Sequence, residues 1–209
     1  MTVRPTRTVR SELHVVTTID VDGQVFPWHE LESVDSTMDY AADLIRGGCQ
    51  PWTVVSSRRQ TSGRGTRGRT WHAPESKGLW VSVVLPTPPC AGNLDTVSVL
   101  AARSLVEAFG KFTDRVFGIK PPNDVTIDGR KIAGILLESV SCGSTVGSVI
   151  LGMGVNLSQS AGDFLKAGLP DATSLWLETG RDIESVRLLR AFLRRFKPEY
   201  ERTVLKRET

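Results

Sequence analysis

The residues best suited to chemistry lie in one Gly/Arg-rich segment, from Gln60 to Trp71, which reads Gln-Thr-Ser-Gly-Arg-Gly-Thr-Arg-Gly-Arg-Thr-Trp. Its three glycines let the backbone turn amide groups toward a ligand. Its three arginines supply guanidinium groups that match phosphate or carboxylate. The segment therefore predicts an anion site, although an RNA-binding segment or a solvated surface loop would have a similar composition.

Two further segments could complete such a site. Lys120 precedes two prolines, which would hold the chain stiffly and place the ammonium group as a point charge for phosphate. Gly152 and Gly154 interrupt an apolar strand, which often lets a ligand approach the backbone closely. Each segment has a plainer interpretation: Lys120 as a surface lysine before the turn formers Asn123 and Asp124, and the glycines as bulges in a strand.

The charge distribution supports a local anion site. The 209 residues carry a net charge of +3, but Leu44 to Pro74 contains six arginines and no acid, so the rest of the chain sums to −3. Positive charge confined to one segment indicates a local site more than a general affinity for nucleic acid. No apolar run approaches the roughly 18 residues of a membrane span. Three scattered cysteines predict a reducing, cytoplasmic setting, and the three histidines have no metal-ligand spacing.

The elements that position these residues follow from periodicity and turn signals. Alternation over residues 13–33 around Asp22-Gly23 predicts a hairpin, and Asp128-Gly129 predicts a second between 125–127 and 131–138. Helices are expected from Asp35 or Ser36 to Gly47, and over residues 95–109, 172–178 and 183–206. Further strands are expected over residues 52–57, 79–85, 116–120 and 145–157. This mixed order predicts one α+β domain over residues 1–209, with a mixed, largely antiparallel central sheet packed with helices.

Taken in order, six motifs resemble the catalytic domain of the biotin-protein ligases over roughly residues 30 to 160. They are Val34-Asp35-Ser36-Thr37, Gln60 to Trp71, Gly78 to Ser82, Lys120 to Asp124, Asp128 to Glu138, and Gly152 to Asn156. The resemblance implies that ATP, with Mg²⁺, activates biotin to biotinyl-5'-AMP. It further implies transfer of biotin to a lysine of a biotin carboxyl carrier protein domain of an acyl-CoA carboxylase.

The resemblance also implies roles for individual residues, with Arg64 and Lys120 as the catalytic charges and no protein-held metal. The implied biotin-binding residues are Ser36, Thr37, Gln60, Gly63, Arg64, Trp71, Lys120, Gly134, Leu136 and Val155. The implied nucleotide-binding residues are Arg64, Arg67, Arg69, Trp71, Lys120, Asn123 and Asn156.

Three positions depart from the family pattern. Thr66 replaces the second arginine of the usual Gly-Arg-Gly-Arg, so we expect looser retention of the adenylate. Pro121 replaces the tryptophan of the usual Lys-Trp-Pro-Asn-Asp, which removes aromatic surface near the nucleotide. Met38 stands where the family commonly has asparagine.

The family's accessory domains are not expected in this chain. About 30 residues precede the first motif, too few for a helix-turn-helix domain, so we expect no DNA binding. No full C-terminal β-barrel is expected either. A homodimer paired through a sheet edge is compatible with the predicted strands. Two alternatives stay open: an RNA-binding module that uses the Gly/Arg segment, and a lipoate or octanoate ligase of the same architecture.

Overall fold

One sheet organises the chain. The computed structural model describes residues 11–74, 76–87, 94–121, 123–142 and 145–205. In this part of the chain, eight strands form a sheet in the order β1-β2-β3-β4-β8-β7-β6-β5. Their bounds are β1 Ser11–Val21, β2 Gln24–Val34, β3 Val54–Gln60, β4 Gly78–Leu85, β5 Gly118–Lys120, β6 Asp124–Ile127, β7 Arg130–Cys142 and β8 Thr145–Asn156. Neighbouring strands run antiparallel except β2 and β3, which confirms the predicted α+β class with a mixed, largely antiparallel sheet.

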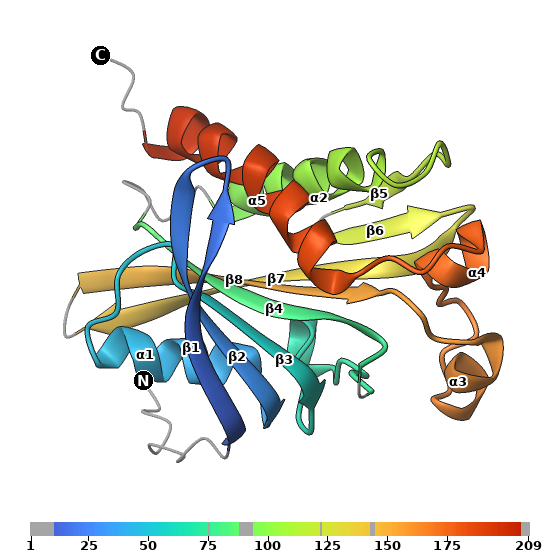
Figure 1. Cartoon of the computed structure of the whole chain (residues 1–209), viewed down its shortest axis with the longest axis horizontal. Coiled ribbons are helices and arrows are strands. Elements are labelled where there is room, and N and C mark those ends of the chain that lie inside the picture. The colour runs from blue at the N-terminus through green and yellow to red at the C-terminus, as the bar shows by residue number, and fades with distance from the viewer. Residues whose placement is uncertain (1–10, 75, 88–93, 122, 143–144, 206–209) are drawn as a thin grey trace.

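Helices cover both faces of this sheet (Figure 1). Helix α1 (Thr37–Arg46) lies on one face, and α2 (Leu94–Phe109) and α5 (Ser185–Tyr200) lie on the other. Short helices α3 (Ala161–Lys166) and α4 (Leu175–Thr179) follow β8, and a π-helical turn (Glu201–Leu205) extends α5. The larger hydrophobic core lies on the face with α2 and α5, and a smaller one lies beneath α1. No helix in the described residues has the length and apolar character needed to cross a membrane.

The two predicted hairpins are confirmed. Asp22 and Gly23 join β1 to β2 with φ values of 53° and 82°, and Asp128 and Gly129 join β6 to β7 with 48° and 78°. Two consecutive positive φ angles are the signature of the tight type I′ turn, whose twist matches that of the flanking strands. The turns therefore fix the register of both hairpins.

The parallel β2–β3 pair creates the edge at which the site is built. Parallel neighbours need a crossover, and α1 supplies it, with Met38, Ala41 and Ile45 buried against the sheet. Val34 at the end of β2 pairs with Gln60 at the end of β3. The start of α1 and the Gly/Arg-rich segment consequently leave the sheet side by side.

Some boundaries differ from the predictions. Helix α3 was not predicted, because its six residues are too few to show a helical period; a capping box between Ser160 and Asp163 starts it. The last helix runs over residues 185–200 and continues as a π-helical turn to 205, close to the predicted span of 183 to about 206. Cys49 is a free thiol, while Cys90 lies outside the described residues.

Candidate active site

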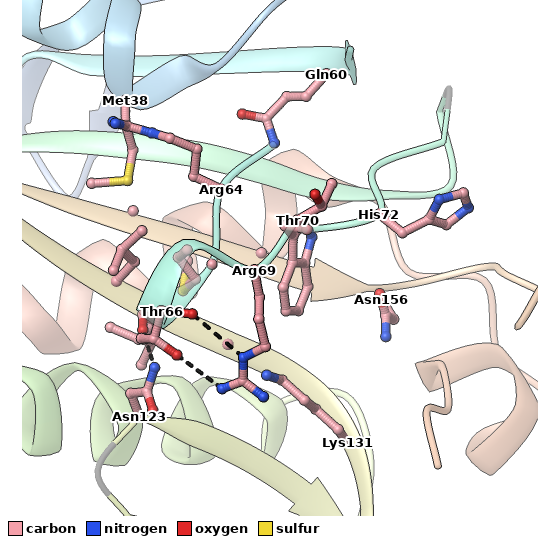
Figure 2. Close-up of a pocket in the computed structure, with 18 of the residues that line it drawn as sticks. Met38, Gln60, Arg64, Thr66, Arg69, Thr70, His72, Asn123, Lys131 and Asn156 are labelled. Carbon is pink, nitrogen blue, oxygen red and sulfur yellow. Dashed lines mark hydrogen bonds between the residues drawn. The ribbon is translucent and has the colours of Figure 1, made fainter. Parts of the chain in front are cut away.

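A pocket of about 230 Å³ opens on the α1 face of the sheet. The start of α1, the Gly/Arg-rich segment and the facing parts of β7 and β8 contribute its walls (Figure 2). Three segments that are distant in the sequence thus meet around one cavity.

Glycines form the floor of the pocket. Gly134 lies on β7, and Gly152 and Gly154 lie on β8, where successive residues alternate between the pocket and the larger core. A Cβ atom on Gly154 would lie 2.4 Å from the Trp71 ring, and one on Gly134 would lie 2.8 Å from it. A Cβ on Gly152 would lie 2.6 Å from the Met38 sulfur. Because contacts this short are sterically excluded, only bare backbone lets Trp71 and Met38 lie so close to the sheet.

Hydroxyl and amide groups gather at the start of α1. The Thr37 amide and Oγ1 both donate to Gln60 Oε1, at 2.8 and 3.0 Å. Ser82 Oγ donates to Thr37 Oγ1 at 2.8 Å. These bonds fix Thr37 and Gln60 beside Ser36, whose hydroxyl is buried. The pocket therefore has a polar end able to bind a ligand with both donors and acceptors.

Unpaired buried polar atoms at the pocket indicate a place where a ligand can bind. Within the described residues, the buried side-chain atoms without a hydrogen-bond partner are Ser36 Oγ, Arg64 Nε, Trp71 Nε1 and Gln159 Oε1. The first three belong to residues that line the pocket. An unpaired buried polar group costs about 1–3 kcal/mol. A ligand that pairs with these three atoms would recover that cost.

Arg64 is anchored between two carboxylates. Its Nη2 lies 2.8 Å from Glu138 of β7 and 3.1 Å from Asp39 of α1, and its side chain is 25% exposed. These ion pairs fix the guanidinium at the pocket, while Nε has no partner within the described chain. The Nε–H group is consequently a donor that Arg64 can offer to an anionic ligand.

Arg69 and Lys131 place further positive charge on the lower side of the pocket in Figure 2. Arg69 donates to the Thr66 carbonyl at 3.4 Å and to Thr66 Oγ1 at 3.0 Å. The Lys131 ammonium group is paired with Asp124 at 2.6 Å and lies 5.1 Å from the centre of a Trp71 ring. Lys131 was missed by sequence reasoning, although it lies within the motif Asp128 to Glu138.

Most residues predicted for the site meet at this pocket. Its lining includes Ser36, Thr37, Gln60, Arg64, Arg69, Trp71, Asn123, Gly134, Leu136 and Asn156. Two of these amide side chains are already engaged. Asn156 donates to the Thr173 carbonyl and accepts from Gln159, each at 3.0 Å, and Asn123 donates to the Ile135 carbonyl at 2.6 Å. These bonds hold both amides in place at the edge of the pocket.

Four predicted residues lie outside the lining. Lys120 is exposed at the end of the short edge strand β5, and Arg67 is exposed in a 3₁₀ turn with φ 58°. Val155 is fully buried in the larger core, because strand alternation turns it away from the pocket. Gly63 supports the pocket indirectly: its carbonyl accepts the Trp71 amide at 2.8 Å.

The departures from the family pattern have visible consequences at two positions. Thr66 lines the pocket, and its hydroxyl accepts a hydrogen bond from Arg69. Position 66, where the family pattern has an arginine, therefore carries a neutral hydrogen-bond acceptor in this chain. Met38 lies against Gly152. Pro121 is exposed in a turn, and Pro122 lies outside the described residues.

Comparisons with known proteins agree with this architecture. The chain is 32% identical over 197 residues to the Bifunctional ligase/repressor BirA of Bacillus subtilis, covering 94% of this chain and 60% of that protein. It is 34% identical over 156 residues to the Biotin--[acetyl-CoA-carboxylase] ligase of Mycobacterium tuberculosis, covering 71% and 55%. The chain thus spans about 60% or less of the length of these curated relatives.

Solved structures show the same arrangement. The biotin protein ligase from Aquifex aeolicus in complex with biotin and ATP superposes with a TM-score of 0.74 at 29% identity, covering 86% of this chain and 73% of that one. The Leishmania major enzyme in complex with biotinyl-5-AMP gives 0.60 at 25% identity, covering 79% and 71%. Residues 30–156 match the Biotin/lipoate A/B protein ligase family. This chain is therefore a member of the biotin/lipoate A/B protein ligase family.

Proposed function

We propose that this chain is the catalytic domain of a biotin-protein ligase, which activates biotin with ATP to biotinyl-5'-AMP and transfers the biotinyl group to a lysine of a carrier protein. The observation that carries the proposal is the glycine-floored pocket with three unpaired polar atoms at its wall. The fused ring system of biotin has a compact apolar part and a ureido group that both donates and accepts hydrogen bonds. Such a ligand matches a slot with a flat floor and a hydroxyl- and amide-lined end.

In this proposal the start of α1 recognises the ureido group. Ser36 Oγ and the Gln60 amide supply the hydrogen bonds, and Thr37 holds Gln60 in place. Trp71 and Met38 border the slot, since each packs against the glycine floor. An acid without a ureido group would leave the polar end unpaired, which disfavours lipoate or octanoate as the substrate.

The first chemical step joins two anions. A carboxylate oxygen of biotin attacks the α-phosphorus of ATP, the bond from that phosphorus to the bridging oxygen breaks, and pyrophosphate leaves. The obstacle is repulsion between the carboxylate and the triphosphate, so catalysis requires fixed positive charge at the α-phosphate. In this proposal Arg64 supplies one such charge, since it lines the pocket and its Nε has no partner among the described residues.

The second positive charge is assigned to Lys131, which lines the pocket. Lys120 is the residue expected from the family pattern. It is exposed at the end of β5 and lies outside the pocket lining, so we keep it as the alternative. In the second step the acceptor lysine, as a neutral amine, attacks the acyl carbon. AMP leaves, an amide forms, and the amine proton passes to solvent.

We propose that Mg²⁺ enters with the nucleotide, because this ion is commonly held by substrate phosphates and water. Among the described residues, no group of three histidine, cysteine or acidic side chains converges to hold a metal ion. We assign no catalytic step to the ion.

The acceptor follows from the relatives' names. Because a Mycobacterium tuberculosis relative is a Biotin--[acetyl-CoA-carboxylase] ligase, we propose the biotin carboxyl carrier domain of such a carboxylase as partner. The absence of DNA binding, the cytoplasmic location, the single-domain assignment and a homodimer stay predictions.

Pyrophosphate exchange into ATP tests the proposal directly. Exchange should require biotin and should be absent with lipoate, with octanoate or without an acid. Arg64→Ala should lower biotin-dependent exchange by more than about tenfold, which corresponds to about 1.4 kcal/mol of transition-state stabilisation. Exchange that depends on lipoate would refute biotin as the substrate. Binding of RNA that weakens steeply with salt and needs no biotin would favour the RNA-binding alternative.

A further inference from the structure

Thr173 connects two residues of the pocket to α4. It lies between α3 and α4 and is fully buried. Its carbonyl accepts a hydrogen bond from Asn156 Nδ2 at 3.0 Å, and its amide donates to the Lys131 carbonyl at 2.8 Å. Its hydroxyl donates to Glu178 of α4. Because Asn156 and Lys131 both line the pocket, Thr173 contacts two site residues without lining the pocket itself.

Glu178 is a buried carboxylate that holds the Thr173 hydroxyl. Its side chain is 3% exposed, and buried acids of this kind are rare unless they are paired. Arg130 Nη2 lies 2.8 Å from Glu178 Oε1, the oxygen that accepts the Thr173 hydroxyl, and Arg115 Nη2 lies 3.5 Å from Oε2. Both carboxylate oxygens are thus engaged, so Glu178 holds Thr173 from a fixed position.

The segment 171–173 runs alongside the start of β7. The Lys131 amide donates to the Asp171 carbonyl at 2.8 Å, and Lys131 and Ala172 form a parallel bridge. The main chain of Lys131 is therefore bonded to this segment on both sides of the residue. A displacement of Thr173 would move the main chain that carries the Lys131 ammonium group to the pocket.

The Thr173 carbonyl also determines which group Asn156 presents to the pocket. A carbonyl oxygen only accepts hydrogen bonds, so the Asn156 atom that faces it is the amide nitrogen. Gln159 Nε2 donates to Asn156 Oδ1 at 3.0 Å, which fixes the same orientation. The second N–H group of Asn156 Nδ2 has no partner in the described part of the chain. It is consequently a donor for a ligand, and ATP carries acceptors on its base, ribose and phosphates.

We propose that Thr173 and Glu178 are positioning residues for the ATP half of the pocket. Glu178 holds the Thr173 hydroxyl, and the Thr173 main chain holds Asn156 and Lys131. The inference rests on the proposed function, because it takes ATP as the ligand of these two residues.

The biotin half of the pocket is held by different bonds. Thr37 is fixed by Gln60 and Ser82, and none of these bonds involves the segment 171–178. Loss of the Glu178–Thr173 contact should therefore weaken ATP binding and leave biotin binding unchanged.

Calorimetric titration of the full chain tests this difference, with ATP and Mg²⁺ in one experiment and biotin in another. Glu178→Gln and Thr173→Val should each weaken ATP binding by at least about fivefold. Each should change the affinity for biotin by less than about twofold. Thr173→Ser keeps the hydroxyl and should bind ATP within about twofold of the unaltered chain. The matched control is Glu199→Gln on α5, which alters another carboxylate paired with two arginines but lies outside the pocket lining, and it should leave both affinities unchanged.

Glu178→Gln should fold, because Arg115 and Arg130 are 46% and 48% exposed and water can solvate them. Thr173→Val keeps the shape of the side chain and provides a second route to the same loss; circular dichroism verifies the fold of each variant. Equal weakening of ATP and biotin binding would indicate a general loosening of the pocket and would overturn the proposal. Unchanged ATP affinity in both folded variants would also overturn it.

Pyrophosphate exchange separates this inference from the proposed function. An unaltered chain that binds ATP but catalyses no biotin-dependent exchange would refute the ligase proposal alone. An active chain whose Glu178→Gln and Thr173→Val variants bind ATP normally would refute the positioning role alone.

Discussion

Replacing Gly154 with alanine should damage the slot while leaving the chain folded. The new Cβ would lie 2.4 Å from the nearest Trp71 ring carbon, whereas non-bonded carbons normally stay about 3.5–4.0 Å apart. The ring must therefore move by about 1 Å or more. Overfilling a packed site of this kind costs about 1–3 kcal/mol, which corresponds to about 5- to 150-fold weaker ligand binding.

The assay is biotin-dependent pyrophosphate exchange, with KM for biotin as the readout. Two other glycines provide graded controls. Gly152→Ala meets only the flexible end of Met38, at 2.6 Å, so its effect should be smaller. Gly162→Ala, in α3, places its Cβ 3.7 Å from Ser160 Oγ, an ordinary contact, and should leave KM unchanged. If Gly154→Ala raises KM no more than Gly162→Ala does, the glycine floor is not the acid-binding surface.

Three further outcomes are expected. Thr66→Arg should add a cation at the pocket and slow release of biotinyl-AMP by several-fold, measured as radiolabel retained on the protein during gel filtration; an unchanged release rate would contradict the role given to this position. Lys131→Met should lower the exchange rate by more than about tenfold, or about 1.4 kcal/mol, and Lys120→Met by much less; the reverse order would return the catalytic charge to Lys120. The Lys77 ammonium group and the Ser160 amide and hydroxyl hold the pKa of Asp163 well below its usual range. Because the folded-state pKa is depressed, this carboxylate stabilises the protein above its unfolded pKa of about 3.9, and that stabilisation is lost as the pH falls. In urea unfolding, Asp163→Asn should therefore be less stable than the unaltered chain at pH 7 and approach it near pH 2; an equal difference at both pH values would refute the linkage.

Local signals predicted the fold well. Asp-Gly turns between alternating segments marked both hairpins, and the spacing of Met38, Ala41 and Ile45 marked α1. Pairing between distant segments left no comparable signal. Nothing in the sequence states that Val34 lies beside Gln60, which is the contact that brings the start of α1 to the Gly/Arg-rich segment.

The same limit applies to the site. Most of the site residues predicted from motif order line the pocket, but orientation depends on strand alternation and packing. Val155 follows the floor residue Gly154 and therefore points into the opposite core. Lys120 lies on a short edge strand, while Lys131 reaches the cavity and contacts Trp71.

A binding surface made of main chain has an evolutionary consequence. At Gly134, Gly152 and Gly154 the sheet beneath the ligand carries no side chain to exchange, and any enlargement at those positions obstructs the cavity. Selection can retune which acid is accepted through the side chains around these glycines, such as Met38, Trp71 and Leu136. Sequence changes that alter substrate preference should therefore concentrate in the side chains around the glycines, while the three glycines themselves stay unchanged.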